Sequence, residues 1–399
     1  MNCHRFAPLS LLLLAGFTAL RAAEPPLQDV VRDSLEFSAA QYSRMLARVE
    51  GKVGNPRTVA KDEVKLVGAT DWTCGFFPGS LWYLFEATGD PKWRDAAAKA
   101  TAGLESAQDN RRSHDVGFIL YCSYGNGLRL TGDPAYRPVL LKGAESLGTR
   151  FNAKVGSLQS WDRRHGWEFP VIIDNMMNLE LLLWAARAGN TPRYRDIAVA
   201  HADTTLRNHY RPDASSYHVV DYDPATGQVL HRVTHQGAAD GSAWARGQMW
   251  GLYGFTLMYR ETREPRYLEQ AKKIAEFVLN HPRLPADKIP YWDFDAPDIP
   301  QAPRDVAAAA IMCSALFELS DLVDAATGRR YAACAEQQLR TMASPAYRAK
   351  LGENHDFLLM HATGNLPAHD EIDVPINYAD YYFLEALLRC KARLARPAH

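Results

Sequence analysis

The chain has 399 residues, of which 47% are hydrophobic, and 45 Lys and Arg against 46 Asp and Glu give a formal net charge of -1. This composition supplies enough apolar side chains for a large core in one domain or two and shows no sign of disorder. The near-zero charge argues against nucleic acid as a partner, since duplex binders usually carry a basic surplus, but an acidic sugar needs only a few local cations.

Residues 1–23 predict a secretory signal peptide. A short basic start precedes an apolar stretch over 9–20, and the small residues Ala22 and Ala23 come just before a polar segment. The apolar stretch is short for a membrane span, although an uncleaved membrane anchor is the alternative. We therefore expect an exported protein, periplasmic or secreted, whose mature part 24–399 forms a single domain without stable membrane insertion.

Five cysteines follow this segment, namely Cys74, Cys122, Cys313, Cys334 and Cys390. Their number is odd, their spacing is wide, and no CxxC pair or Cys/His cluster has the spacing of a zinc site. We expect buried free thiols, with at most one disulfide in an oxidising compartment.

A short turn phrase recurs along the chain and divides it into pairs of helices. It reads TGDPKW at 88–93 and TGDPAY at 131–136, and looser copies follow at 188–194, 262–267 and 327–331. In this phrase Gly or Asn suits the left-handed C-cap of one helix, Pro starts the next, and an aromatic residue packs back. Apolar residues recur at helical spacing on both sides of it. Such internal self-similarity predicts a repeat of paired helices.

Twelve helices are predicted on this basis. The odd-numbered ones start near 28, 92, 135, 192, 265 and 330, and the even-numbered ones near 75, 114, 175, 244, 304 and 378. Between 209 and 243 the apolar period changes to two, which predicts a β-hairpin, and the Pro-rich segments 282–303 and 364–376 predict long loops. Six pairs with short turns can close into an all-α (α/α)6 barrel, a six-hairpin toroid with a small β-hairpin decoration. An open helical array is the alternative.

Unusual polar and aromatic residues gather at the starts of the even-numbered helices. They include Trp72, His114, Asp115, Asp174, Arg246, Trp250 and Tyr378. In a ring of alternating helices all even-numbered ones run the same way, so these residues should converge at one mouth. Aromatic walls with a few polar groups are what a sugar-binding cleft requires.

Asp115 and Asp174 are the candidate acid–base groups. Both stand where an N-cap Asp would stand, and N-capping is the simplest explanation of such residues. Asp174, however, lies among Ile172, Ile173 and Met176, where apolar surroundings would oppose its ionisation. A second carboxylate nearby would raise one of the two pKa values further. A carboxylic acid that keeps its proton near neutral pH is a usable general acid.

Arg246 and Trp250 lie four residues apart and can point into the same space. The alternatives are a structural ion pair for Arg246 and core packing for Trp250. His114 is interpreted as a structural neighbour rather than as a catalyst, and His218 and Gln236 lie on and beside the predicted hairpin.

Five motifs in order resemble those of the unsaturated glucuronyl hydrolases, glycoside hydrolase family 88. They are HDVGF at 114–118, DNMMN at 174–178, ARGQMWG at 245–251, YWDFD at 291–295 and YYFLEAL at 381–387. The similarity runs through nearly the whole mature chain, and the (α/α)6 barrel that it implies agrees with the helix count. Members of the family remove the 4,5-unsaturated uronic acid that polysaccharide lyases leave at the non-reducing end of an oligosaccharide.

The chemistry that the resemblance implies is hydration rather than direct glycosidic displacement. An acid protonates C4 of the enol ether, an oxocarbenium-like centre forms at C5, water adds there, and the hemiketal opens and expels the aglycone. Asp174 is implied as the general acid and Asp115 as its partner carboxylate. The residues implied to face the sugar are Trp72, His114, Trp161, His218, Gln236, Arg246, Trp250 and Tyr378. The implied partner is an acidic unsaturated oligosaccharide, with no metal or organic cofactor.

Three other functions stay open on the sequence. Unsaturated rhamnogalacturonyl hydrolases of pectin breakdown share the fold and chemistry, although the wording around Arg246 favours the glucuronyl group. A sugar epimerase on a similar ring would generally work through histidines, whereas the matched motifs centre on Asp. A non-catalytic carbohydrate-binding ring would show no turnover. The sequence indicates neither the aglycone and its sulfation nor the oligomeric state.

Overall fold

The structure is a computed structural model that describes residues 24–396. The predicted signal peptide over 1–23 lies outside the described residues. None of the helices within 24–396 combines the length and the apolar character that spanning a bilayer requires.

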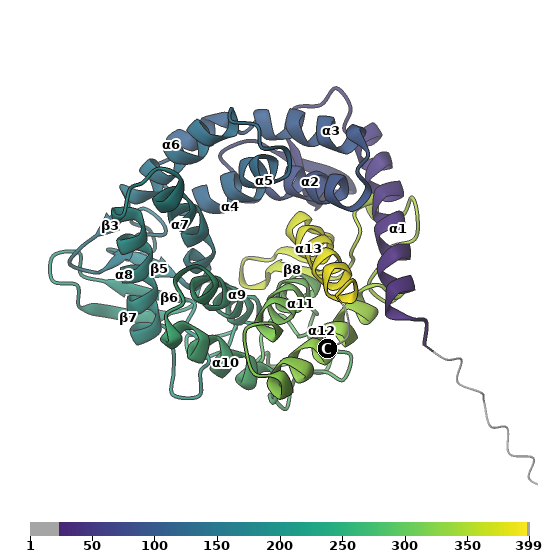
Figure 1. Cartoon of the computed structure of the whole chain (residues 1–399). Helices are drawn as coiled ribbons and strands as arrows, with labels where there is room; N and C mark the ends of the chain where they lie inside the picture. Colours follow the sequence, from purple (N-terminus) through teal and green to yellow (C-terminus); the bar gives the residue numbers. More distant parts are fainter. Residues whose placement is uncertain (1–23, 397–399) are drawn as a thin grey trace, which may run out of the picture.

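Two layers of helices form a ring (Figure 1). The inner layer contains α2 (Phe76–Thr88), α4 (Val116–Leu120) and α5 (Asn126–Thr131), α7 (Leu179–Ala188), α9 (Ala245–Thr262), α11 (Val306–Ser320) and α13 (Asn377–Leu394). The outer layer contains α1 (Leu27–Arg48), α3 (Pro91–Ala102), α6 (Tyr136–Gly148), α8 (Arg193–Asn208), α10 (Pro265–Leu279) and α12 (Ala325–Met342). A π-helical turn at Tyr121–Gly125 joins α4 to α5 into one inner helix. Counted in this way, residues 24–396 form the twelve helices that the sequence predicts.

Contacts between neighbouring inner helices close the ring. Around it, α2 packs against α13, α13 against α11, α11 against α9, α9 against α7 and α7 against α4, while α5 packs back on α2. The last helix of the chain therefore fills the gap beside the first inner one. The predicted (α/α)6 barrel is confirmed, and the open array is excluded.

Four of the five copies of the turn phrase form tight connections from inner to outer helices, whereas the copy predicted at 327–331 lies inside α12 and was wrong. Gly89 ends α2 with φ of 70° and Gly132 ends α5 with φ of 69°, a left-handed conformation that glycine adopts without strain. Asp90 then caps α3, because its side chain accepts a 3.0 Å hydrogen bond from the backbone N–H of Lys92. Because outer and inner helices alternate along the chain from α1 to α13, all inner helices run in the same direction.

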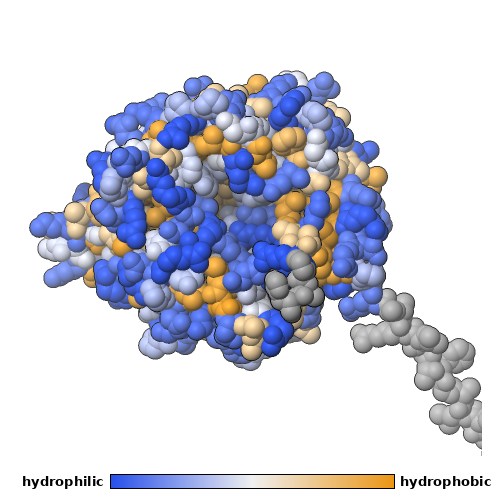
Figure 2. Space-filling view, in the orientation of Figure 1, coloured by the Kyte–Doolittle hydropathy of each residue, from blue (hydrophilic) through white to orange (hydrophobic). Residues whose placement is uncertain are grey.

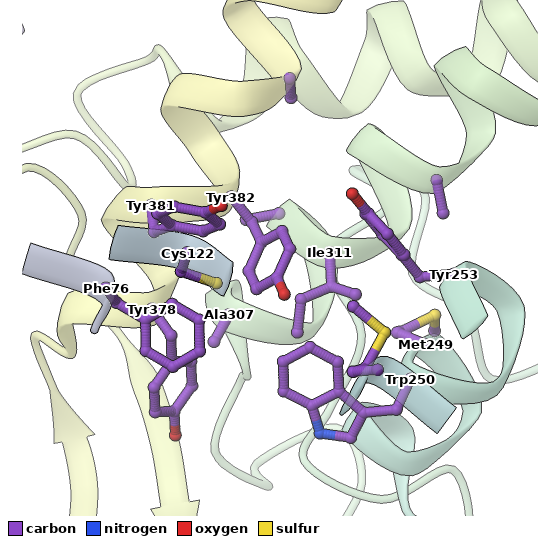
Figure 3. Close-up of a cluster of buried hydrophobic side chains, with 14 of the residues drawn as sticks. Phe76, Cys122, Met249, Trp250, Tyr253, Ala307, Ile311, Tyr378, Tyr381 and Tyr382 are labelled. Atoms are coloured by element: carbon purple, nitrogen blue, oxygen red, sulfur yellow. The ribbon is translucent and has the colours of Figure 1, made fainter. Parts of the chain in front are cut away.

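The core fills the space between the layers and the centre of the ring. Helix α11 is buried along nearly its whole length because it packs against α9, α12 and α13. Inner-helix side chains meet in a central cluster that contains Phe76, Trp250, Tyr253, Tyr378, Tyr381 and Tyr382 (Figure 3). The five cysteines within the described residues are all buried and unpaired, as predicted.

Small antiparallel sheets decorate the ring. They are formed by β1 (Asn55–Ala60) with β2 (Glu63–Val67), β3 (Phe151–Asn152) with β4 (Ser157–Leu158), β5 (Pro170–Ile172) with β6 (Val219–Tyr222) and β7 (Val229–Val233), and β8 (Ala362–Asn365) with β9 (Asp370–Val374). The predicted hairpin is confirmed as β6–β7, in which Val219 pairs with Val233. The prediction of a plain loop over 364–376 was wrong, because β8 and β9 pair there from Ala362 opposite Val374.

Candidate active site

The predicted residues meet at the mouth of the ring where the inner helices begin. Asp115 directly precedes α4, and Asp174 lies in the 3-10 turn Ile173–Asn178 that leads into α7. Arg246 is in the first turn of α9 and Tyr378 in the first turn of α13. The shared direction of the inner helices therefore brings together residues that lie far apart in the sequence.

Asp174 is a buried carboxyl group with one free oxygen. The residue is 7% exposed, and its Oδ2 atom has no hydrogen-bond partner within the described part of the chain. Burial raises the pKa of Asp174 to about 7, with the negative charge of Asp115 adding to the rise and the positive charge of Arg246 opposing it. The N-cap position of its turn belongs to Ile172, so capping does not explain this carboxyl. A substantial fraction of Asp174 is therefore protonated near neutral pH and can donate its proton.

His218 is a neutral hydrogen-bond donor beside this acid. Its Nδ1 atom accepts from the backbone N–H groups of His235 at 3.2 Å and Gln236 at 3.1 Å, which leaves the ring proton on Nε2. Burial lowers the pKa of His218, so the ring stays neutral. Its Nε2 atom faces Oδ2 of Asp174 at 3.8 Å, and Trp161 stands edge-on to its ring with centroids 6.3 Å apart.

Asp115 is positioned by the two residues that precede it in the sequence. Ser113 Oγ donates a 2.6 Å hydrogen bond to Oδ2, and His114 Nε2 lies 3.3 Å from Oδ1. His114 is itself buried, with Nδ1 3.3 Å from the side-chain nitrogen of Asn178. Although Asp115 occupies the N-cap position of α4, its side chain accepts no capping hydrogen bond. The geometry agrees with His114 as a structural neighbour and leaves Asp115 facing the mouth.

Arg246 forms the structural ion pair that the sequence left as an alternative. Its Nη1 atom lies 2.7 Å from Oδ2 of the fully buried Asp305, and its terminal nitrogens also donate to the carbonyl oxygens of Thr363 and Gly364. The guanidinium carbon lies 4.6 Å from the centroid of the Trp244 ring. These contacts fasten β8 to α9 and α11. Three of its hydrogen bonds are therefore committed to the protein, and a contact between Arg246 and the sugar stays a prediction.

Gln236 holds the same strand from the other side. Its Nε2 atom donates a 2.9 Å hydrogen bond to the carbonyl of Gly364, and its backbone N–H is one of the two donors to His218. Gln236 thus helps to position β8 and His218, and the contact with the sugar that the resemblance implies stays a prediction.

Aromatic rings line the remainder of the mouth. The rings of Trp72 and Tyr378 have centroids 5.1 Å apart, and Trp250 packs on Phe118 at the same centroid distance. The indole N–H of Trp250 is buried without a hydrogen-bond partner within the described residues. In Figure 3, this indole nitrogen and the hydroxyl of Tyr378 point toward the same end of the aromatic cluster. Trp250 therefore packs in the core while its N–H faces Asp174, whose pKa it lowers.

Asp305 and Trp244 have roles at the mouth that the sequence analysis did not predict. Asp305 pairs with Arg246 and also caps α11, because its Oδ1 atom accepts from the backbone N–H of Ala307. Trp244 packs on the ring of His218 with centroids 4.4 Å apart. The sequence could have predicted Asp305 as an N-cap, because it directly precedes a long apolar helix, but it contains no local pattern that predicts the pairing with Arg246.

The opposite mouth contains a cavity of about 630 Å³. It is lined from the C-terminal halves of inner helices by Arg129, Arg260 and Arg389 together with carboxylates that pair with them, and by several tyrosines. The space-filling view shows the ring hollowed near its centre, with hydrophilic residues around the hollow (Figure 2). Neither Asp115 nor Asp174 lines this cavity.

Comparison with known proteins shows similarity to one family model, to two curated proteins and to a solved structure, and all four point to the same family. The model described as Glycosyl Hydrolase Family 88 matches residues 48–289. An unsaturated glucuronyl hydrolase of Formosa agariphila is 47% identical over 360 residues, which cover 88% of this chain and 89% of the relative. One from Bacillus sp. strain GL1 is 36% identical over 332 residues, covering 80% and 86%. The crystal structure of an unsaturated glucuronyl hydrolase specific for heparin has a TM-score of 0.89 and 48% identity, covering 92% of this chain and 99% of that one.

Proposed function

The chain belongs to glycoside hydrolase family 88, and from this premise we propose how its residues remove an unsaturated uronic acid. It is a glycoside hydrolase that acts on unsaturated glucuronyl oligosaccharides, which polysaccharide lyases generate. The observation that carries the mechanism is the buried Asp174, whose raised pKa makes it a proton donor near neutral pH and whose Oδ2 atom has no hydrogen-bond partner within the described residues.

The first step is protonation of the substrate. With the unsaturated ring over Asp174, the carboxyl group passes its proton to C4 of the enol ether, and positive charge develops at C5 and the ring oxygen. The carboxylate left on Asp174 is stabilised by the Nε2–H of His218 and by the nearby charge of Arg246. Asp115 holds hydroxyl groups of the sugar from the other side of the mouth and raises the proton affinity of Asp174.

The second step is the addition of water. A water molecule attacks C5 and gives its proton to the carboxylate of Asp174, which restores the acid. The product is a hemiketal at C5, and its ring opens and releases the aglycone from C1. The proton taken from Asp174 in the first step thus returns to it in the second, so one water is consumed in each turnover.

The geometry also separates this function from the alternatives. An epimerase would need histidines that exchange protons, whereas burial lowers the pKa values of His114 and His218 and each holds a neighbour in place. Both relatives described above are unsaturated glucuronyl hydrolases, which favours this group over the rhamnogalacturonyl one.

The test uses disaccharides that lyases have left with a conjugated alkene, whose ultraviolet absorbance disappears on hydration. We expect wild type to remove the absorbance and Asp174→Asn to lose about 10²–10⁴ in kcat, the usual worth of a positioned general acid. Asp95→Asn on the exposed face of α3 is the matched control and should retain full activity. If wild type leaves every glycosaminoglycan- and pectin-derived alkene unchanged, a non-catalytic carbohydrate-binding ring becomes the better interpretation.

We further propose that the protein is exported, as the composition of residues 1–23 suggests. The signal peptide would be removed near Ala23, and the mature enzyme would meet lyase products in the periplasm or outside the cell. N-terminal sequencing of the protein from fractionated cells tests this, and an intact Met1 in the cytoplasmic fraction would contradict it.

A further inference from the structure

A loop at the same mouth carries a cation without an acidic partner. Arg164 lies between β4 and β5, and within residues 24–396 no carboxylate oxygen comes within 4.0 Å of its guanidinium. Arginines close to it in sequence or space are paired: Arg112 and Arg150 with Asp162, and Arg163 with Glu168. The contrast shows that Arg164 is set apart from the ion pairs that fasten this loop.

Two rings hold the Arg164 guanidinium in place. Its central carbon lies 4.4 Å from the centroid of the Trp161 ring, and Nη2 lies 3.3 Å from Nε2 of His235. The imidazole of His235 is neutral, because burial and the adjacent Arg164 lower its pKa to about 4, so its Nε2 atom can accept from the guanidinium. A guanidinium stacked on an indole in this way is ordered while its charge is still uncompensated.

The cation stands one ring away from the reacting sugar. Trp161 lies edge-on to His218, whose Nε2 atom faces Asp174, and the backbone of Trp161 pairs with Ser113, the residue that donates to Asp115. We therefore place a uronyl ring that presents C4 to Asp174 on the side of Trp161 that faces His218, with its aglycone extending past Trp161 toward the outer side. Arg164 is exposed on this outer side.

The position also indicates which anionic group reaches Arg164. The uronyl carboxylate is attached to C5, the neighbour of C4, so it stays beside Asp174 and is separated from Arg164 by Trp161 and His218. An anion at the position of Arg164 belongs to the next sugar. Sulfate is the strong hydrogen-bond acceptor that such an aglycone carries, and a planar guanidinium can donate two parallel hydrogen bonds to it.

Building on the proposed function, we propose that Arg164, positioned by Trp161 and His235, binds a sulfate ester on the aglycone sugar and makes sulfated unsaturated disaccharides the preferred substrates. Because the contact is formed before the chemical step, it should act mainly through KM. Arg164 is thus a specificity-determining residue and takes no part in proton transfer.

The experiment compares kcat/KM for chondroitin-lyase disaccharides that carry sulfate on O4, on O6 or nowhere. Wild type should favour at least one sulfated form, and Arg164→Gln should lower kcat/KM for that form by about 10- to 100-fold, the usual effect of losing a charge-assisted hydrogen bond. The same variant should leave the unsulfated disaccharide unchanged within about twofold. Arg163→Gln, whose guanidinium already pairs with Glu168, is the matched control and should change neither rate.

Two results overturn the inference while the proposed function stands. An equal loss on sulfated and unsulfated substrates would mean that Arg164 serves the uronyl carboxylate or the fold. Turnover of the unsulfated disaccharide, with no sulfated form favoured and no effect of Arg164→Gln, would mean that it binds no substrate anion. If wild type hydrates none of the disaccharides, the proposed function falls first and this inference with it.

Discussion

Replacing Asp174 by Asn should remove activity and stabilise the fold above neutral pH. The pKa of Asp174 is raised, so the folded protein binds the proton more tightly than the unfolded chain, and stability is lost as the pH rises from the ordinary pKa of 3.8 through about 7. Once both states are ionised, the loss amounts to about 4 kcal/mol, because a tenfold difference in proton affinity is worth about 1.4 kcal/mol. Asparagine fills the same space and carries no such cost.

The assay is urea unfolding of wild type and Asp174→Asn at two pH values. The advantage of the variant should be about 4 kcal/mol at pH 8 and fall to about 2 kcal/mol at pH 5, where the folded wild type keeps its proton. Asp305→Asn is the opposing control and should lose about 3–5 kcal/mol at both pH values, because the buried Arg246 loses its counter-charge. An Asp174→Asn protein that is less stable than wild type at pH 8 would refute the view that this carboxyl is buried at the expense of stability.

Three further outcomes follow from the same mouth. The kcat/KM of wild type should fall as the pH rises through about 7, because only protonated Asp174 donates. Asp115→Asn should move this fall to lower pH, since the Asp115 charge helps to raise the pKa of Asp174, and a profile of kcat/KM against pH checks both. Arg246→Met should lower the free energy of unfolding by about 3–5 kcal/mol, and adding Asp305→Asn should recover part of that loss in urea titrations, because no uncompensated buried charge then remains. His218→Phe should reduce turnover in the absorbance assay and cost about 1–3 kcal/mol in unfolding, because two backbone N–H groups lose their acceptor; unchanged turnover would exclude His218 from stabilising the acid.

The helical ring was predictable because its signals are local. The turn phrases at 88–93 and 131–136 contain the C-cap glycine and the residues that start the next helix, so each helix pair is specified within a few residues. The hairpin of β8 and β9 has no such signal. Its place over the mouth depends on hydrogen bonds from Arg246 and Gln236, which lie more than a hundred residues earlier in the chain.

The sequence predicted which residues gather at the candidate site, but it did not predict the contacts that each of them makes. Asp115, Asp174 and Arg246 were expected to converge because each starts an inner helix, and they do. Whether a side chain is free or already paired depends on partners that only the folded chain supplies, and Asp305 is that partner for Arg246. Asp174 is the opposite case: the sequence allowed an N-capping role for it, and the structure excludes this role because Ile172 holds the N-cap position.

The common direction of the inner helices also shapes the electric field of the molecule. The peptide dipoles of a helix leave about half a positive charge at its N-terminus. Six inner helices have their N-termini at this mouth and together contribute on the order of three positive elementary charges there, in a chain whose formal net charge is -1. In physiological salt this field extends for about 8 Å beyond the surface, which is enough to guide an acidic sugar over the last part of its approach. The opposite mouth receives the negative ends of the same dipoles, and there Arg129, Arg260 and Arg389 are paired with carboxylates. A nearly neutral protein thus attracts an anion through the arrangement of its backbone, without a basic surface that would also bind unrelated polyanions.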